Sequence, residues 1–135
     1  MLVITLGDPL SVTQECLVAL REIWSQPRSG AIVLVGALSI WQEEWRQRPE
    51  LAPPWQLIQR WDQIDHQRPG LYFYDIMPNQ APALASTLSE RERGLIATHS
   101  LEALRNPSLL SRKTAVLTAP IDKKVCQLAG FAFPG

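Results

Sequence analysis

Residues 31–35 read Ala31-Ile32-Val33-Leu34-Val35, a continuous apolar run rich in β-branched side chains. A run of this length and composition is typical of a strand that is covered on both faces, as in a parallel sheet. It begins directly after Gly30, and Gly36 is expected to end it. The run therefore predicts a buried strand at the centre of the fold.

On the amino-terminal side of this run, the sequence predicts one further strand and one helix. The apolar residues 2–6 predict the first strand. Ser11 and Gln14 have the spacing of a capping box, and Pro27 with Gly30 is expected to end the helix that follows. The apolar residues expected on one face of this helix are Val12, Cys16, Leu20, Ile23 and Trp24.

On the carboxyl-terminal side, apolar residues at helical spacing predict a core-facing helix that ends at Pro49, namely Leu38, Trp41 and Trp45. Residues 55–58 and 71–74 are shorter strand candidates. They lie in residues 46–82, which hold a large share of the prolines. This segment is expected to be a peripheral excursion rather than a linker between domains.

The last third predicts a helix, a strand and a terminal helix. Ser89 and Glu92 form a second capping box, and the helix should reach the region of residues 106–107. Its apolar residues are Leu95, Ile96, Ala103 and Leu104. Residues 114–117 predict the last strand. For the terminal helix we expect Pro120 in the first turn and Asp122 near the positive end of the helix dipole. The helix is expected to end at Gly130. The apolar residues expected on one face of it are Ile121, Val125 and Leu128.

The alternation of strands and helices predicts an α/β sandwich formed by residues 1–135 as a single domain. Thirteen basic and thirteen acidic residues give a net charge of zero, which argues against nucleic acid as a partner. The sequence shows neither a signal peptide nor a membrane span of roughly 18 apolar residues, so we expect a cytoplasmic protein. Cys16 and Cys126 are expected to be buried and inert.

Two segments can carry chemistry, and each has a plain structural alternative. Asp8 follows the first strand, where a carboxylate can orient a hydroxyl, an ammonium or a metal-bound water, or can simply cap the next turn. Residues 118–123 open the terminal helix, whose free N–H groups can hold an anion, or form an ordinary capped helix. His66 and His99 lack ligand partners at i+3 or i+4, so no local metal site is predicted. His99 is expected to be structural, at a helix margin, and His66 to lie in an exposed loop.

Residues 4–9, the helix from Ser89, residues 117–123 and residues 129–135 resemble the amino-terminal part of the 4-hydroxythreonine-4-phosphate dehydrogenase family of pyridoxal phosphate synthesis. The resemblance implies a three-layer α/β/α sandwich of the isopropylmalate-dehydrogenase-like kind, and a homodimer. It also implies NAD and a divalent metal in the full-length enzyme, with 4-phosphooxy-threonine as substrate. On the same ground, Asp8, Thr118 and Lys123 are candidate substrate-binding residues.

Two departures from the family pattern change the functional prediction. The family continues Gly-Asp-Pro with Ala-Gly-Ile-Gly, whereas residues 10–13 here read Leu-Ser-Val-Thr and contain no glycine. The family segment that matches residues 131–135 runs on into a substrate-binding His-Thr-Glu, with the metal-binding histidines beyond it, and this sequence has no such positions. We therefore expect a truncated or degenerate homologue without catalytic residues, bound metal or cofactor of its own.

Two alternatives remain. The chain can be a non-catalytic protein-interaction module that kept the fold, or a small-molecule binder that uses the helix opening at Pro120. A parallel sheet cut partway through leaves an edge strand and an apolar helix face uncovered. Self-association or a protein partner is therefore expected.

Overall fold

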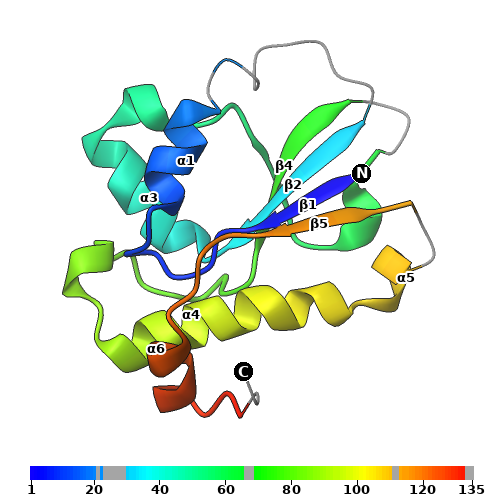
Figure 1. Ribbon diagram of the computed structural model, residues 1–135. Helices are drawn as coiled ribbons and strands as arrows, with labels where there is room; N and C mark the ends of the chain where they lie inside the picture. The colour runs from blue at the N-terminus through cyan, green and yellow to red at the C-terminus, as the bar shows by residue number, and fades with distance from the viewer. Residues whose placement is uncertain (21, 23–29, 66–68, 111–112, 133–135) are drawn as a thin grey trace.

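The computed structural model describes residues 1–20, 22, 30–65, 69–110 and 113–132 and contains a five-stranded sheet. The strands are β1 (Leu2–Thr5), β2 (Ala31–Gly36), β3 (Gln56–Ile58), β4 (Gly70–Asp75) and β5 (Ala115–Thr118). All pairs are parallel and the order is β3-β4-β2-β1-β5 (Figure 1). Every strand expected from the sequence is present, and the α/β class is confirmed. The expectation that residues 46–82 form a peripheral excursion is wrong, because they supply β3 and β4, and β4 lies inside the sheet.

Helices cover the two faces of this sheet. In the described part of the chain they are α1 (Thr13–Ala19), α3 (Leu38–Gln47), α4 (Glu90–Glu102), α5 (Pro107–Leu110) and α6 (Lys123–Leu128). Short 3-10 helices span Pro49–Leu51, Trp61–Gln63, Ala85–Thr87 and Ala103–Arg105. Figure 1 shows α1 and α3 together to the left of the sheet and α5 to its right.

Alternate residues of each strand pack into separate cores because successive strand side chains point to opposite faces. Ile4 and Phe73 lie in the core that contains Leu17 of α1 and Trp41 of α3. Val3, one residue along β1, lies in the opposite core with Trp61 and Leu109. The sheet is therefore the middle of three layers, as predicted.

Two local predictions in the helices are confirmed. Trp41 and Trp45 are buried, and their ring centroids are 5.8 Å apart. The Ser89 N–H donates to Glu92 Oε2 over 2.8 Å while the Glu92 N–H donates to Ser89 Oγ over 3.2 Å, which is the expected capping box. The predicted core position of Trp24 falls outside the described residues.

The predicted start of α1 is wrong by about one residue. The Ser11 N–H is bonded to the Asp8 carbonyl oxygen in a turn over 2.9 Å, so the helix begins at Thr13, without a Ser11–Gln14 capping box. The residues that face the core also differ from the predicted set by one position, which corresponds to about 100° around the helix. The buried face accordingly contains Thr13 and Leu17, whereas Val12 and Cys16 are exposed and Leu20 is partly buried. The expected face positions Ile23 and Trp24 and the expected helix end at Pro27 lie outside the described residues.

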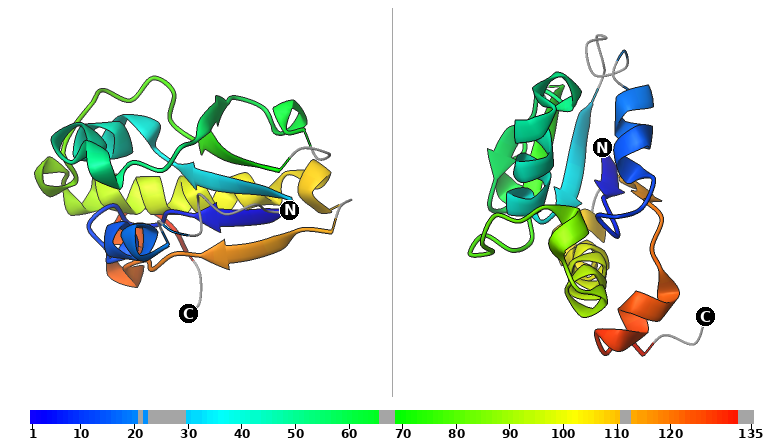
Figure 2. Two further views of the ribbon diagram at one scale, coloured as in Figure 1. Left: turned by 90° about the horizontal axis from the view of Figure 1, so that it is seen from above. Right: turned by 90° about the vertical axis from the view of Figure 1, so that its left-hand side faces the viewer.

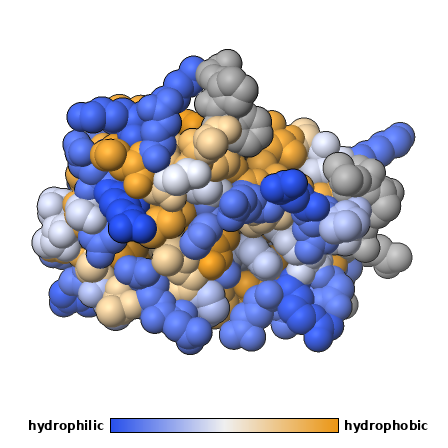
Figure 3. Space-filling view, turned by 90° about the horizontal axis from the view of Figure 1, so that it is seen from below, coloured by the Kyte–Doolittle hydropathy of each residue, from blue (hydrophilic) through white to orange (hydrophobic). Residues whose placement is uncertain are grey.

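The predicted start of the terminal helix is also wrong. Pro120 precedes α6, which begins at Lys123 with Asp122 as its N-cap. Val125 and Cys126 form the buried face, while Leu128 is exposed; apolar residues reach the surface in places on the side of α4 and α6 (Figure 3). The stop at Gly130 is confirmed by its φ of 92° and by its N–H bond to the Gln127 carbonyl oxygen.

The predicted burial is confirmed for Cys126 but is wrong for Cys16, which is exposed, so the two cysteine thiols are expected to differ in reactivity. Burial raises the pKa of the Cys126 thiol, which disfavours the reactive thiolate, whereas Cys16 is exposed. Titration of the native protein with a chromogenic disulfide reagent should therefore detect one thiol rapidly, and the second only after denaturation. Equal reaction of both thiols in the native protein would contradict the packing of α6.

Candidate functional site

The two segments singled out in the sequence meet at the carboxyl ends of β1 and β5. The Asp8 N–H donates to the Pro120 carbonyl oxygen over 3.3 Å, and the Ala119 N–H donates to the Thr5 carbonyl oxygen over 2.9 Å. Gly7 has a φ of 61°, and a Cβ there would lie 2.5 Å from the Pro120 oxygen. Only glycine combines this conformation with so close an approach of the two loops. The structure thus brings the two candidate segments together, as open α/β sheets commonly do at ligand sites.

The carboxylate of Asp8 is buried and accepts hydrogen bonds from groups of the protein itself. Asp8 is 2% exposed. Arg93 of α4 donates from Nε to Asp8 Oδ1 over 2.9 Å and from Nη2 to Oδ2, and the Leu10 N–H also donates to Oδ1 over 3.0 Å. The bond to Asp8 raises the pKa of Arg93. Both oxygens that a substrate hydroxyl or a metal-bound water would need are therefore engaged.

Arg93 is a site residue that the sequence analysis missed. It stands among Glu90, Arg91 and Glu92 at the start of α4, where charged side chains normally face solvent. Its side chain is 17% exposed because it reaches back to the loop after β1. Nothing in its local sequence distinguishes it from Arg91, since its partner lies 85 residues away.

Thr118 and Lys123 lie near this pair but do not converge on it. Thr118 ends β5 and Lys123 begins α6, and both are exposed. The first free N–H groups of α6 are bonded to its own N-cap, because Asp122 Oδ1 accepts from Lys124 N over 2.8 Å and from Val125 N over 3.4 Å. Residues 118–123 therefore lead into an ordinary capped helix, which was the alternative to an anion-binding site. The substrate-binding roles of Asp8, Thr118 and Lys123 stay predictions.

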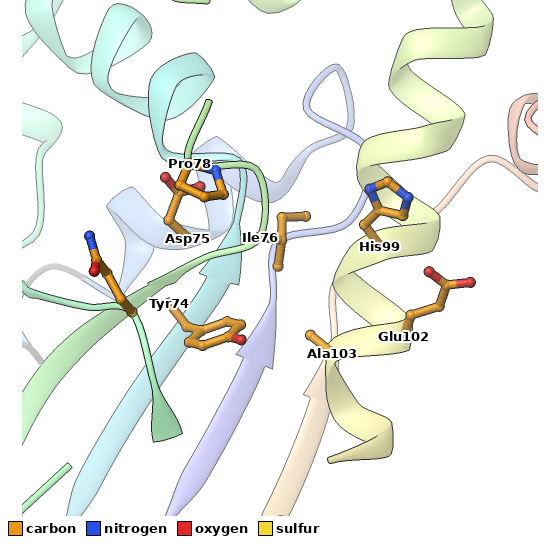
Figure 4. Close-up of a pocket in the computed structure, with 8 residues that line it drawn as sticks. Tyr74, Asp75, Ile76, Pro78, His99, Glu102 and Ala103 are labelled. Atoms are coloured by element: carbon orange, nitrogen blue, oxygen red, sulfur yellow. The ribbon is translucent and has the colours of Figure 1, made fainter. Parts of the chain in front are cut away.

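A second candidate is a pocket of about 450 Å³ beyond the end of β4 (Figure 4). Its lining includes Tyr74, Asp75, His99 and Glu102. Asp75 Oδ1 accepts from Leu38 N and from Met77 N, each over 3.1 Å, so this carboxylate caps the start of α3. Figure 4 places the Asp75 and Glu102 carboxylates at opposite sides of the pocket. The polar groups do not converge on one point, and the pocket carries no catalytic arrangement.

The histidines and acidic residues provide no metal-binding group in the described part of the chain. Three or more His, Cys, Asp or Glu side chains placed to hold a metal ion do not occur among those residues. His99 lies half-buried in the last turn of α4, and His66 lies outside the described residues.

No helix among the described residues is long and apolar enough to span a membrane.

Comparison with known proteins supports the fold through structure alone. Neither the models of known protein families nor the sequences of curated proteins match this chain. The whole chain superposes on 42% of a protein assigned as a 4-hydroxythreonine-4-phosphate dehydrogenase from Salmonella typhimurium, with a TM-score of 0.68 and 23% identity. The whole chain also superposes on 41% of 4-hydroxythreonine-4-phosphate dehydrogenase from Klebsiella pneumoniae, with a TM-score of 0.65 and 23% identity. The chain spans about two fifths of these proteins. The predicted resemblance is confirmed at the level of the fold.

Proposed function

We propose that this chain is a cytoplasmic, truncated or degenerate homologue of the 4-hydroxythreonine-4-phosphate dehydrogenases of pyridoxal phosphate synthesis, and that it does not catalyse hydride transfer by itself. The shared fold supports the relationship. The loss of glycine from residues 10–13 supports the loss of activity, because that loop now leads into α1 through an internally bonded turn.

The observation that carries this proposal is the ion pair between the buried Asp8 carboxylate and Arg93. A carboxylate at the carboxyl end of β1 is the natural candidate for orienting a substrate hydroxyl. Here its release would leave the Arg93 side chain, which is 17% exposed, without its hydrogen-bonded carboxylate, at a cost of about 3 kcal/mol, the lower end for breaking a buried pair. The interactions of a ligand with Asp8 would have to offset that cost before they contributed to its net binding free energy.

The residues described do not fit the divalent metal that the resemblance implies for the full-length enzymes. A catalytic metal needs about three converging protein ligands. Asp8 is bound to Arg93, and the half-buried His99 lines the separate pocket at the end of β4. We therefore propose that this chain alone does not bind the metal.

An absorbance assay for NADH tests the lack of activity. The purified chain, incubated with 4-phosphooxy-threonine, NAD and Mg²⁺, should form no NADH above a buffer control. A full-length 4-hydroxythreonine-4-phosphate dehydrogenase under the same conditions provides the positive control. NADH formation that rises in proportion to the concentration of this chain would overturn the proposal.

A second candidate function, protein interaction, is favoured by the exposure of β5. All four residues of β5 are exposed, with Val116 at 50% and Leu117 at 52%. Ala115 N and Ala119 N donate to β1, so the alternating peptide groups of Val116 and Thr118 face away from the sheet. We call this row of peptide groups, with the side chains of residues 116–118, the free edge of β5. Such an edge is a template for pairing with another polypeptide.

Retention of a partner from cell extract tests the interaction role. The immobilised chain should retain a stable polypeptide that the Leu117→Lys variant loses, because the lysine places a charge on the apolar edge. Leu57→Lys is the matched control: Leu57 is 47% exposed and lies on the opposite edge strand, β3. Equal retention by both variants would show that the free edge of β5 is not used.

A further inference from the structure

We propose that the pocket beyond the end of β4 binds an aliphatic diamine, with one ammonium group at Asp75 and the other at Glu102. Its volume of about 450 Å³ lies within the range of small-molecule sites in proteins, which is about 300–1,000 Å³. All of its lining residues lie between Gln59 and Ala103. Figure 2 shows β4 and β5 on opposite sides of the sheet, with β2 and β1 between them. The pocket is therefore formed without β5, α6 or the end of β1.

The charge of the pocket favours a cationic ligand. None of the eight described residues that line it is lysine or arginine, whereas Asp75 and Glu102 each contribute a carboxylate. Glu102 is the last residue of α4, and the carboxyl end of a helix carries a partial negative charge that stabilises cations. Among the described residues, the Glu102 carboxylate has no hydrogen-bond or ion-pair partner. This carboxylate is therefore available to a ligand.

The Asp75 carboxylate is held in place but keeps its charge. Its Oδ1 accepts from Leu38 N and from Met77 N, each over 3.1 Å. Both donors are neutral peptide groups, so they fix the carboxylate without neutralising it. In the described part of the chain, Oδ2 accepts no hydrogen bond. An ammonium group at Oδ2 would form a charge-assisted hydrogen bond with an acceptor that is already oriented.

The pocket is apolar and aromatic between its two carboxylates. Figure 4 shows Ile76, Tyr74 and Ala103 in this middle part. The Tyr74 ring is stacked on Trp61, with ring centroids 4.6 Å apart and planes 19° apart, so one of its faces is covered and its orientation is fixed. An alkyl chain that packs against these side chains is removed from water, which is favourable. The middle of the pocket therefore suits methylene groups.

The separation of the carboxylates distinguishes a diamine from a metal ion. A metal ion needs several ligands around one point, whereas the two carboxylates lie at opposite sides of the pocket (Figure 4). Primary alkyl amines are protonated at neutral pH, as lysine is, so a diamine carries a charge at each end. His99 lies three residues before Glu102, on the same side of α4. A neutral imidazole there can accept a further hydrogen bond from the ammonium group at Glu102.

Calorimetric titration of the full chain tests this proposal. The probes are the series from diaminobutane to diaminooctane, together with the monoamine of each chain length. One diamine length should bind best, because only one length places both ammonium groups at the carboxylates. Its Kd should be at least about tenfold below that of the matching monoamine, which forms only one of the two charge-assisted hydrogen bonds.

Two variants test the two ends of the pocket. Glu102→Gln and Asp75→Asn should each weaken binding of the best diamine by about tenfold and remove its advantage over the monoamine. Asp75→Asn keeps an amide oxygen that can accept from Leu38 N, so its circular dichroism spectrum should match that of the parent. Glu50→Gln is the matched control: Glu50 is exposed in the 3-10 helix after α3, and the change in net charge is the same.

Three results would overturn the diamine site. They are the lack of saturable binding by every diamine, equal affinities of the diamines and their monoamines, and binding by Glu102→Gln or Asp75→Asn that matches binding by Glu50→Gln. These measurements involve neither NADH formation nor retention of a polypeptide. Failure of the diamine site therefore leaves the proposed function as it stands.

Discussion

Gly94→Ala is expected to destabilise the protein by about 3 kcal/mol, even though alanine favours a helix over glycine by about 1 kcal/mol. Gly94 lies in α4 where α6 crosses it. A Cβ at this position would lie 1.9 Å from the Val125 carbonyl oxygen and 3.0 Å from the Ala129 Cβ. A backbone oxygen cannot rotate away as a flexible side chain can. The whole of α6 must therefore shift, which exposes its buried residues.

Denaturant unfolding and thiol reactivity check this prediction together. The unfolding midpoint should fall, and the Cys126 thiol should become reactive in the native protein as α6 moves from α4. Gly30→Ala is the matched control, since a Cβ at Gly30 has no neighbour within 4 Å. If Gly94→Ala unfolds at the same midpoint as the parent, or at a higher one, the close crossing of α4 and α6 is refuted.

Asp8→Ala should destabilise the protein by about 3 kcal/mol, the lower end for breaking a buried pair, because it leaves the partly buried Arg93 without its hydrogen-bonded carboxylate. The same substitution removes the acceptor for the Leu10 N–H and so loosens the loop that joins β1 to α1. The effect is structural and should appear in the free energy of unfolding with no ligand present.

A double-mutant cycle identifies the source of this loss. Adding Arg93→Met to Asp8→Ala should recover part of the stability, since no unpaired charge then remains in the site. Asp62→Ala is the control: it breaks the exposed Arg60–Asp62 pair and should leave the unfolding midpoint almost unchanged. Additive effects at positions 8 and 93 would show that the two side chains do not interact.

The strands and the start of α4 were predictable because their signals are local. The run at residues 31–35 indicates a strand by composition alone, and Ser89 with Glu92 forms its capping box within a single turn. The start of α6 was mispredicted because Asp122, rather than a residue before Pro120, is its N-cap. The start of α1 was mispredicted because distant contacts compete with the local pattern. The turn at Asp8 is held by Pro120 and Arg93, and it moves the beginning of α1 to Thr13.

The sequence alone was sufficient for an α/β sandwich built on parallel strands, whereas the meeting of the segments around Asp8 and Thr118 is seen only in the structure. Periodicity and capping residues carry the information for the sandwich. Only the tertiary structure decided what Asp8 does and which edge is exposed. The partner of Asp8 lies 85 residues away in the sequence, and the exposure of β5 depends on the strand order, which no local pattern specifies.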